Sequence, residues 1–467
     1  MSEKIDKRII IIITGLASFI TPFLSSSVNV ALPVMGSEFS ADAILLGWVV
    51  TSYLLSAAIF IVPFGKIADM YGRRIVFISG LAIIAISTLL AALSYSALML
   101  IACRILQGIG SAMIFGTSVA ILTASFPLKE RGKVLGINVG IVYSGLSLGP
   151  FLGGIITQYA GWRYIFILNV LICMVSLLLA LRRLKEDWHA ERSGRFDTAG
   201  CVLYGVMLFA LMYGLSVLPD ISGAYWLLAG LVGMIIFAWW ELRNSNPVLN
   251  IRIFRNNITF TFSNMAALIN YSATFAISFL LSLYLQYIQG LSPQIAGLVL
   301  ISSPVVQAIL SPAAGKLSDR IEPRIVASTG MGITAAGLFL FMFLNESTPL
   351  VFIVAILMLM GLGFALFSSP NMNAIMSSVD KRDYGVASGM VSTMRLTGQM
   401  MSLGIAMLTM SVFIGRVQIT PDMHGQLMSS ITASFSIFAV LCVAGLIASL
   451  MRGKLRPEQP PVILQRT

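Results

Sequence analysis

Long apolar runs alternate with short polar segments along almost the whole sequence, and 14 of the runs could cross the roughly 30 Å hydrocarbon layer of a bilayer. They lie at 9–34, 43–64, 75–95, 98–126, 134–160, 163–183, 197–218, 224–242, 258–288, 293–314, 325–344, 349–378, 386–413 and 428–451. Because a bilayer interior offers no water to backbone N–H and C=O groups, each run is expected to form a helix. The pattern predicts an all-α membrane protein with 14 transmembrane helices.

The composition supports the same class. Of the 467 residues, 57% are hydrophobic and 10% are charged, whereas a soluble domain carries about 25% charged residues. The four cysteines fall in apolar runs and lack the spacing of a disulfide framework or a metal site. We therefore expect free thiols, no metal and no cofactor.

The positions of the lysines and arginines along the chain explain the net charge of +11. If the N-terminus lies inside and the helices alternate in direction, 26 of the 30 lysines and arginines fall on the inner side. Only Arg163 and Arg416 fall on the outer side, and Arg104 and Arg395 lie within apolar runs. This positive-inside bias predicts that both termini are cytoplasmic, and it accounts for the basic excess without a nucleic-acid partner.

A ten-residue segment recurs 250 positions further along the chain. The segments 65–74 and 315–324 share the first glycine, the lysine, the aspartate and the final arginine at matched places. Each is expected to be a loop between the second and third helices of a six-helix unit, which predicts two pseudo-symmetric six-helix bundles plus two inserted helices. The expected domains are an N-terminal bundle at 1–184, a linker at 185–257 holding inserted helices at about 197–218 and 224–242, and a C-terminal bundle with a short tail at 258–467.

Three further motifs accompany the repeated segment: Arg104–Ala112 in the fourth run, Gly145–Gly154 in the fifth and Asn29–Pro33 near the end of the first. Together with the 14 runs, they make the chain resemble the major facilitator superfamily, specifically its fourteen-helix drug:proton antiporter branch. The resemblance implies a secondary transporter in which two bundles rock about a central site.

This resemblance implies that the repeated segment acts as a latch, which helps to hold the cytoplasmic side of the transporter closed. The residues concerned are Gly65, Asp69, Gly72, Arg73, Arg74, Gly315, Asp319 and Arg324. An aspartate there can accept hydrogen bonds from a helix N-terminus or pair with an arginine. The alternative is a simple basic turn that serves only topology.

The glycine-rich fifth run is interpreted as a hinge. Gly145, Gly149 and Gly153 recur every four residues, which places them on one stripe where another helix can approach closely. Pro150 removes a backbone donor and favours a bend. Ordinary small-residue packing is the alternative.

Arg104 and Arg395 are the two charges embedded in apolar runs, and such a charge is expected to face the bundle interior or a wet cavity. They are predicted either to take part in transport or to be structural arginines satisfied by carbonyl groups. Neutral polar residues on the helices that surround the centre in this family are candidates for substrate binding, or else form interhelical hydrogen bonds. They are Asn29, Tyr53, Gln107, Asn138, Tyr143, Asn264, Asn270, Tyr271, Gln307, Asn371, Asn373 and Gln399.

The acidic residues depart from the family pattern. Drug pumps of this branch usually place an aspartate about five residues before the Asn29–Pro33 motif, where this chain has Leu24. Every acidic residue falls in a loop, a terminus or a helix end. Either Glu38 or Asp42 reaches the centre from a helix end, or the coupling differs from that of the usual member. A neutral or anionic cargo would suit this interior better than a lipophilic cation.

The resulting prediction is a secondary active transporter that exports drugs or other amphipathic small molecules by alternating access, coupled to protons. The alternative is a facilitator or symporter for a small organic anion that uses the embedded arginines. An enzyme is not expected, because no catalytic constellation is present. The expected partners are a small-molecule substrate, protons and the lipid bilayer of the cell membrane, and the protein is expected to be monomeric.

Overall fold

The computed structural model describes residues 7–184, 196–244, 247–249, 251–255, 257–379 and 384–453, and within them the chain forms helices and no strand. Fourteen spans are long and apolar enough to cross a membrane, as the sequence predicts. The first bundle consists of α1 (Lys7–Phe39), α2 (Ala43–Tyr71), α3 (Arg73–Ala92), α4 (Ala97–Ser125), α5 (Leu128–Tyr159) and α6 (Arg163–Arg183). An inserted pair follows, α7 (Thr198–Val217) and α8 (Ile221–Arg243), and then the short α9 (Arg252–Arg255).

The second bundle has two spans that are each built from consecutive segments. Its first span joins α10 (Ile258–Thr274), α11 (Ile277–Leu283) and the π-helical η1 (Tyr284–Ile288), and its second joins α12 (Pro293–Leu300) and α13 (Ser302–Arg320). The remaining spans are α14 (Pro323–Phe341), α15 (Leu350–Ser377), α16 (Tyr384–Phe413) and, after the 3-10 turn η3 (Pro421–Met423), α17 (His424–Leu450).

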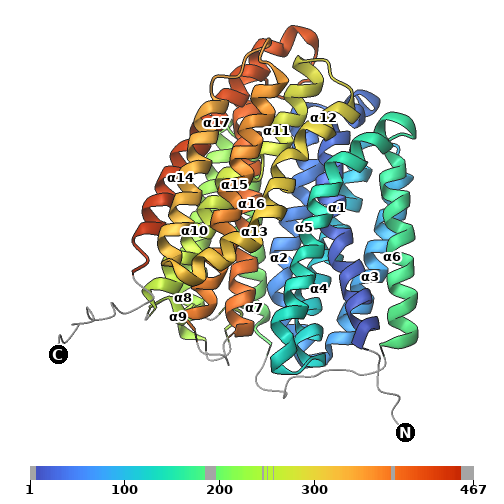
Figure 1. Ribbon diagram of the computed structural model, residues 1–467. Helices are drawn as coiled ribbons and strands as arrows, with labels where there is room; N and C mark the ends of the chain where they lie inside the picture. The colour runs from blue at the N-terminus through green and yellow to red at the C-terminus, as the bar shows by residue number, and fades with distance from the viewer. Residues whose placement is uncertain are drawn as a thin grey trace, which may run out of the picture.

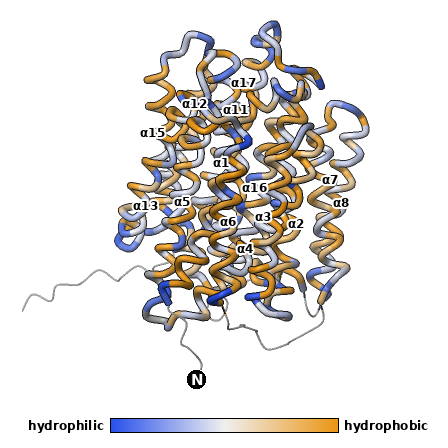
Figure 2. Tube along the Cα trace, turned by 90° about the vertical axis from the view of Figure 1, so that its right-hand side faces the viewer, coloured by the Kyte–Doolittle hydropathy of each residue, from blue (hydrophilic) through white to orange (hydrophobic). Residues whose placement is uncertain are grey.

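Local signals fix where several helices begin. The side chains of Asp42, Ser96, Asn257 and Ser292 each accept a hydrogen bond from the backbone N–H three residues further on, which caps α2, α4, α10 and α12. Such a cap satisfies a donor that a helix start leaves without an intrahelical partner. Hydrophilic residues gather at the two ends of the molecule, and the helices between them are mostly hydrophobic (Figure 2).

The two bundles pack their helices in the same pattern. In the first, α1 packs on α5, α2 on α4, and α3 on both α4 and α6. In the second, α10 packs on α16, α13 on α15, and α14 on both α15 and α17. The bundles stand side by side in Figure 1, and α1 begins and α17 ends at the lower end of that view (the termini end). The fold is therefore two pseudo-symmetric six-helix bundles plus two inserted helices.

The inserted pair, α7 and α8, is a hairpin at the edge of the molecule (Figure 2), and α7 packs against one helix of each bundle, α2 and α16. On α2, the ring of Trp48 lies 6.4 Å from that of Tyr213. On α16, Gly404 faces Met212 and Leu215. The domain limits drawn at 184 and 257 stay predictions, and residues 185–195 of the expected linker lie outside the described residues.

The repeated segment is not a loop, which corrects the prediction. Gly65–Tyr71 forms the last two turns of α2, Arg73 and Arg74 begin α3, and only Gly72 lies outside a helix. Gly72 has φ 114°, a conformation that a side chain would strain. In the second copy, Glu322 takes this place with φ −53° and Pro323 starts the next helix. Because proline's fixed φ suits the first helical position, the second copy turns without a glycine.

Contacts that join the two bundles lie at the end opposite the termini (the distal end). Pro33 has no N–H, so the carbonyl of Asn29, four residues earlier, loses its helical donor. The hydroxyl of Ser282 on α11 donates to this carbonyl at 2.7 Å. The side chain of Gln286 donates to the carbonyl of Val30 at 2.9 Å. The proline in α1 thus exposes backbone acceptors that the other bundle satisfies.

Close backbone approaches reinforce this distal contact. A methyl group added at Gly297 on α12 would overlap the carbonyl oxygen of Pro150 on α5, and one added at Gly154 would overlap that of Pro293. On the other side of the molecule, the backbone N–H of Ala43 donates to the carbonyl of Val417 at 3.2 Å. The distal ends of the two bundles are therefore in direct contact in two places: between α5 and α12, and between the start of α2 and the segment that follows α16.

We predict that Gly297→Ala lowers the melting temperature of the purified protein in detergent. The added methyl group meets backbone atoms that cannot move away like a side chain, and overpacking of this kind costs about 1–3 kcal/mol. Gly332→Ala is the matched control, since a Cβ there meets nothing within 4 Å and alanine favours a helix over glycine. Equal melting temperatures for the two variants would contradict the tight contact between α5 and α12.

Candidate functional site

A cavity of about 180 Å³ lies between the two bundles. Helices α1, α2, α4 and α5 line it from the first bundle, and α10, α11, α12, α13, α15 and α16 line it from the second. Pro150 lies in its wall, so the distal contact between α5 and α12 directly adjoins it. A ligand in this cavity would touch both moving halves of the molecule.

The lining mixes polar and aromatic side chains. Seven of the predicted substrate-binding residues contribute to it: Asn29, Tyr53, Tyr143, Asn270, Tyr271, Gln307 and Gln399. Sequence reasoning missed several hydroxyl side chains, namely Thr21, Ser25, Ser26, Thr274, Ser278, Ser303 and Ser368. The signal for most of them was present, because they lie four or eight residues from a predicted candidate and therefore on the same helical face. Ser25 and Thr21 precede Asn29 in this way, and Ser303 precedes Gln307.

Several polar groups in the lining have no hydrogen-bond partner among the described residues. Asn29 Oδ1, Asn270 Nδ2 and Thr21 Oγ1 are all buried in this state, and Asn29 and Asn270 are each 3% exposed. A buried polar atom without a partner costs about 1–3 kcal/mol. Three such atoms lie around this cavity and thirteen more lie elsewhere among the described residues, so this feature alone does not mark the site.

Arg395 brings the one charged side chain that the lining contains. It projects from α16, and its guanidinium carbon lies 5.6 Å from the ring centroid of Phe115 on α4, across the cavity in the other bundle. No Asp, Glu or His is among the lining residues. The cavity therefore carries positive charge that no lining carboxylate balances.

Arg104 is fully buried beside the cavity rather than in its lining. Its Nε donates to the carbonyl of Val49 at 3.0 Å, and its Nη1 donates to Gln107 Oε1 at 2.9 Å. The guanidinium carbon lies 4.4 Å from the ring centroid of Tyr53, which does line the cavity and whose hydroxyl is 2.8 Å from Ser111 Oγ. Arg104 thus lies outside the cavity and packs against the ring of Tyr53, which forms part of the cavity wall.

Five polar candidates lie outside the cavity lining, and three of them, Gln107, Asn371 and Asn373, form the interhelical hydrogen bonds expected from the sequence as the alternative to substrate binding. Gln107 bridges Arg104 and Thr88, and Asn373 donates to Asp319 at the termini end. Asn264 and Asn371 donate to the carbonyls of Phe260 and Ser263, and Asn138 is buried outside the lining. These residues sit on the expected helices, but their side chains emerge from faces that turn toward neighbours in the same bundle.

The acids considered as possible proton carriers do not reach the cavity. Glu38 pairs with Arg163 at 2.6 Å and accepts a hydrogen bond from the Trp162 indole at 2.7 Å, which ties α1 to the start of α6. Asp42 caps α2 by accepting from the N–H of Leu45. Both carboxylates are therefore occupied at the distal end. The described residues contain no group of three or more His, Cys, Asp or Glu side chains that could hold a metal.

The glycine stripe of α5 packs against α1. Methyl groups added at Gly145, Gly149 and Gly153 would collide with the backbone or side chains of the stretch from Phe19 to Ser27. Below Tyr143 on the face of α5 that lines the cavity, Val139 is 51% exposed, and added methyl groups at Gly136 and Gly140 would meet nothing within 4 Å. The distal half of α5 is thus packed and its other half is open.

The repeated segment links the second and fourth helices of each bundle at the termini end. Asp69 Oδ1 accepts from Arg73 Nη2 at 2.9 Å, and Arg73 Nη1 donates to the carbonyl of Ala120 on α4 at 3.2 Å. In the second copy, Asp319 Oδ1 accepts from Asn373 on α15 at 3.3 Å. Arg74 donates to the carbonyl of Leu184 at the end of α6. The Nε atom of Arg324, by contrast, is buried without a partner.

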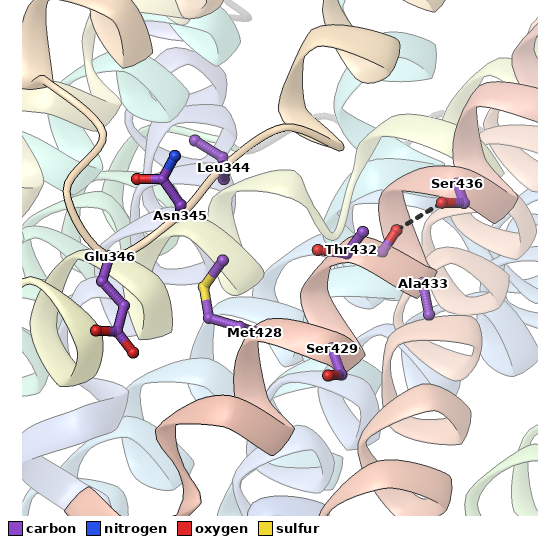
Figure 3. A pocket seen from close by; sticks show the side chains of 8 residues that line it. All are labelled: Leu344, Asn345, Glu346, Met428, Ser429, Thr432, Ala433 and Ser436. Carbon is purple, nitrogen blue, oxygen red and sulfur yellow. Dashed lines mark hydrogen bonds between the residues drawn. The ribbon is translucent and has the colours of Figure 1, made fainter.

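A second concave surface lies at the distal end of the second bundle (Figure 3). Asn345 and Glu346, between α14 and α15, form one side of it, and the first turns of α17 form the other. The hydroxyl of Ser436 there already donates to the carbonyl of Thr432 at 2.8 Å. Because this surface belongs to one bundle alone, it is a weaker candidate than the cavity between the bundles.

Comparison with known families gives a match to the Major Facilitator Superfamily over residues 14–254 and 264–466. The chain is 29% identical to the riboflavin transporter RibZ of Clostridioides difficile (strain 630), over 84% of this chain and 85% of that protein. It is 32% identical to the multidrug resistance protein Stp of Mycobacterium tuberculosis (strain CDC 1551 / Oshkosh), over 85% of this chain and 74% of that protein. It is 28% identical to the methylenomycin A resistance protein of Bacillus subtilis (strain 168), over 85% and 86%.

A solved structure shares the fold. It is a bacterial homologue of the human lysosomal transporter Spinster in an inward-facing and unoccupied conformation, which matches with a TM-score of 0.70 over 97% of each chain at 15% identity. The family match covers nearly the whole chain, and the relatives are transporters rather than enzymes. The chain is therefore a multi-pass membrane transporter of small molecules, and it belongs to the Major Facilitator Superfamily.

Proposed function

We propose that this protein is a secondary active transporter that exports drugs or other amphipathic small molecules from the cell, and that it is driven by proton antiport. The observation that carries the proposal is the cavity between the bundles, which is lined by both halves and lies against their distal contact. A substrate held there would be released on one side or the other as the bundles tilt. Relatives named for multidrug and methylenomycin A resistance support an exporter.

The proposed orientation places the protein in the cell membrane with both termini in the cytoplasm. The distribution of lysine and arginine supports it, since basic residues favour the cytoplasmic side. With this orientation, the distal contact lies outside and the open half of α5 around Val139 lies inside. The conformation is then inward-facing, ready to receive a substrate from the cytoplasm.

Alternating access gives roles to two of the predicted motifs. We assign the hinge to α5, where Gly145, Gly149 and Gly153 let the helix lie directly on α1 while Pro150 contacts α12 of the other bundle. We assign the latch to Asp69 and Asp319, which hold the second helix of each bundle to the fourth. In the inward-facing conformation these bonds stay within each bundle, and the two segments are proposed to hold the cytoplasmic side closed when the transporter faces outward.

A second candidate function is a facilitator or symporter for a small organic anion. The specific observation that favours it is Arg395, a charge in the cavity lining without a lining carboxylate. Arg104 contributes less to such a site, since it bonds to Val49 and Gln107 and lies outside the lining. The two candidates differ in their response to a pH gradient.

We predict that purified protein in liposomes moves a substrate against its gradient when a pH gradient is imposed, and that adding substrate releases protons in a stoichiometric manner. Antiport couples the two fluxes, so collapsing the pH gradient with nigericin should reduce accumulation to the level of protein-free liposomes. The measurement is fluorescent-substrate accumulation alongside a pH-sensitive dye. Flux that is indifferent to the imposed gradient would refute proton coupling and favour the facilitator.

Cysteine labelling tests the orientation and the open side. In a background with all four native cysteines replaced, we predict that Val139→Cys reacts with a membrane-impermeant maleimide only from the cytoplasmic side. Leu32→Cys is the control, because Leu32 is fully buried in the distal half of α1 and should react from neither side. Labelling of Val139→Cys from outside alone would reverse the proposed orientation.

The latch is tested by Asp69→Asn. The bonded pair of Asp69 and Arg73 is half exposed at Asp69, and exposed pairs contribute about 0–1 kcal/mol, so we predict little change in melting temperature. Transport should nevertheless fall by at least about fivefold, because the neutral amide weakens the hold on Arg73, whose Nη1 donates to the Ala120 carbonyl on α4. Asp220→Asn, at the distal start of α8, is the control. A transport rate equal to that of Asp220→Asn would contradict the latch.

A further inference from the structure

We propose that the cavity selects planar aromatic substrates that are neutral or anionic and rejects lipophilic cations, with Arg395 as the residue that sets this preference. This inference rests on the proposed transport function and names the substrate class of the same site. It concerns charge and shape, and it holds for either direction of transport.

The charge argument starts from Arg395. The described residues offer its guanidinium no ion pair and no hydrogen bond, and the centroid of the Phe115 ring lies 5.6 Å from its guanidinium carbon. Arg395 is half-buried, and a charge in a confined cavity is stabilised by a partner of opposite charge or by a hydrogen-bond acceptor. An anionic or acceptor group on a ligand would supply the missing partner, and charge-assisted hydrogen bonds to arginine are among the stronger contacts a site can form. A cation would instead add a second unpaired charge of the same sign.

Among the described residues, the carboxylates that could offset Arg395 are held elsewhere. Glu38 is paired with Arg163, and Asp42 caps α2. The two buried acids, Asp197 and Glu241, lie at the inserted hairpin and accept bonds from the Trp240 indole and from the N–H of Leu249. None of these side chains lines the cavity.

The neutral lining argues for a ligand with hydrogen-bonding edges. The amides of Asn29 on α1 and Asn270 on α10 each carry a buried atom without a partner, and they come from opposite bundles. An amide offers both a donor and an acceptor. Two of them facing one cavity fit a ligand whose rim carries carbonyl and N–H or hydroxyl groups, rather than a bare hydrocarbon.

The aromatic lining argues for a flat ligand. Phe115 and Tyr143 belong to the first bundle, and Tyr271, Phe275 and Phe364 to the second. Aromatic side chains stack well on planar rings, and a ring bound between the bundles would contact both sets. The same residues would also bind a flat cation through its ring, so the charge of Arg395 is what separates the two ligand classes.

The test uses two dyes with the same three-ring xanthene skeleton and opposite charge, fluorescein as the anion and rhodamine 123 as the cation. Binding to the purified full-length protein in detergent is measured by fluorescence anisotropy, and efflux of each dye is measured from liposomes containing the protein. We expect fluorescein to bind at least about tenfold more tightly than rhodamine 123. Arg395→Gln should remove this preference by weakening fluorescein alone, and Arg395→Lys should retain part of it.

Arg416→Gln, an exposed position at the distal end, is the matched control for loss of one positive charge. Equal melting temperatures for this variant and Arg395→Gln establish that both fold. Asn270→Leu is an independent site variant, which should weaken the binding of fluorescein without strengthening the binding of rhodamine 123. Tighter binding of rhodamine 123, no saturable binding of fluorescein, or a fluorescein affinity that Arg395→Gln leaves within threefold would each overturn the inference.

The outcomes separate this inference from the function beneath it. Fluorescein binding that depends on Arg395 but produces no flux supports the inference and contradicts the transporter. Flux of rhodamine 123 in preference to fluorescein supports the transporter and contradicts the inference.

Discussion

The backbone carbonyl of Asn29 has to find its hydrogen-bond donor outside its own helix, because Pro33 cannot supply one. Ser282 in the other bundle supplies the missing donor, as a neighbouring helix can do where proline frees a carbonyl in a membrane helix. The need arises from one residue in α1, and it is met only when the distal ends of the bundles are together. A hydrophobic contact would allow the bundles to slide, whereas this bond fixes the register of α1 against α11. The location of the cavity and its closed side both follow from it.

The cavity is satisfied only in part by the protein itself: Tyr53 bonds to Ser111 and Gln307 donates to Ser368, whereas Asn29 Oδ1, Asn270 Nδ2 and Thr21 Oγ1 have no partner among the described residues. Asn29 takes part in both regions: its carbonyl accepts from Ser282, while its side-chain oxygen is buried and unpartnered. Asn270 is unpartnered in the same way from the other bundle. A transporter needs binding that is favourable yet reversible, and a site that leaves some of its polar groups without protein partners is suited to it. A ligand bound in the cavity would then contact Asn29, whose carbonyl also joins the two bundles.

Fold and site were predictable from the sequence to different degrees. The 14 spans and the duplication follow from apolar runs and a repeated segment, since a bilayer leaves the backbone few options. The charged residues within Gly65–Tyr71 suggest a loop, whereas α2 continues through them, because a helix can extend beyond the apolar layer of the membrane. Gln107 and Arg104 show the other limit: they lie on the correct helix, but only tertiary packing reveals that they face Thr88 and Tyr53 instead of the cavity. The hydroxyl groups of Ser25 and Ser303 lie four residues before Asn29 and Gln307, so the helical period alone predicts that they share the same faces.

The hairpin of α7 and α8 makes the two sides of the molecule unequal. It covers the seam between α2 and α16, whereas it does not reach the equivalent seam between α5 and α12. A molecule dissolved in the lipid therefore meets an additional pair of helices on one side and a direct approach to the α5 seam on the other. A chain whose two bundles are pseudo-symmetric thus presents two unlike seams to the surrounding lipid.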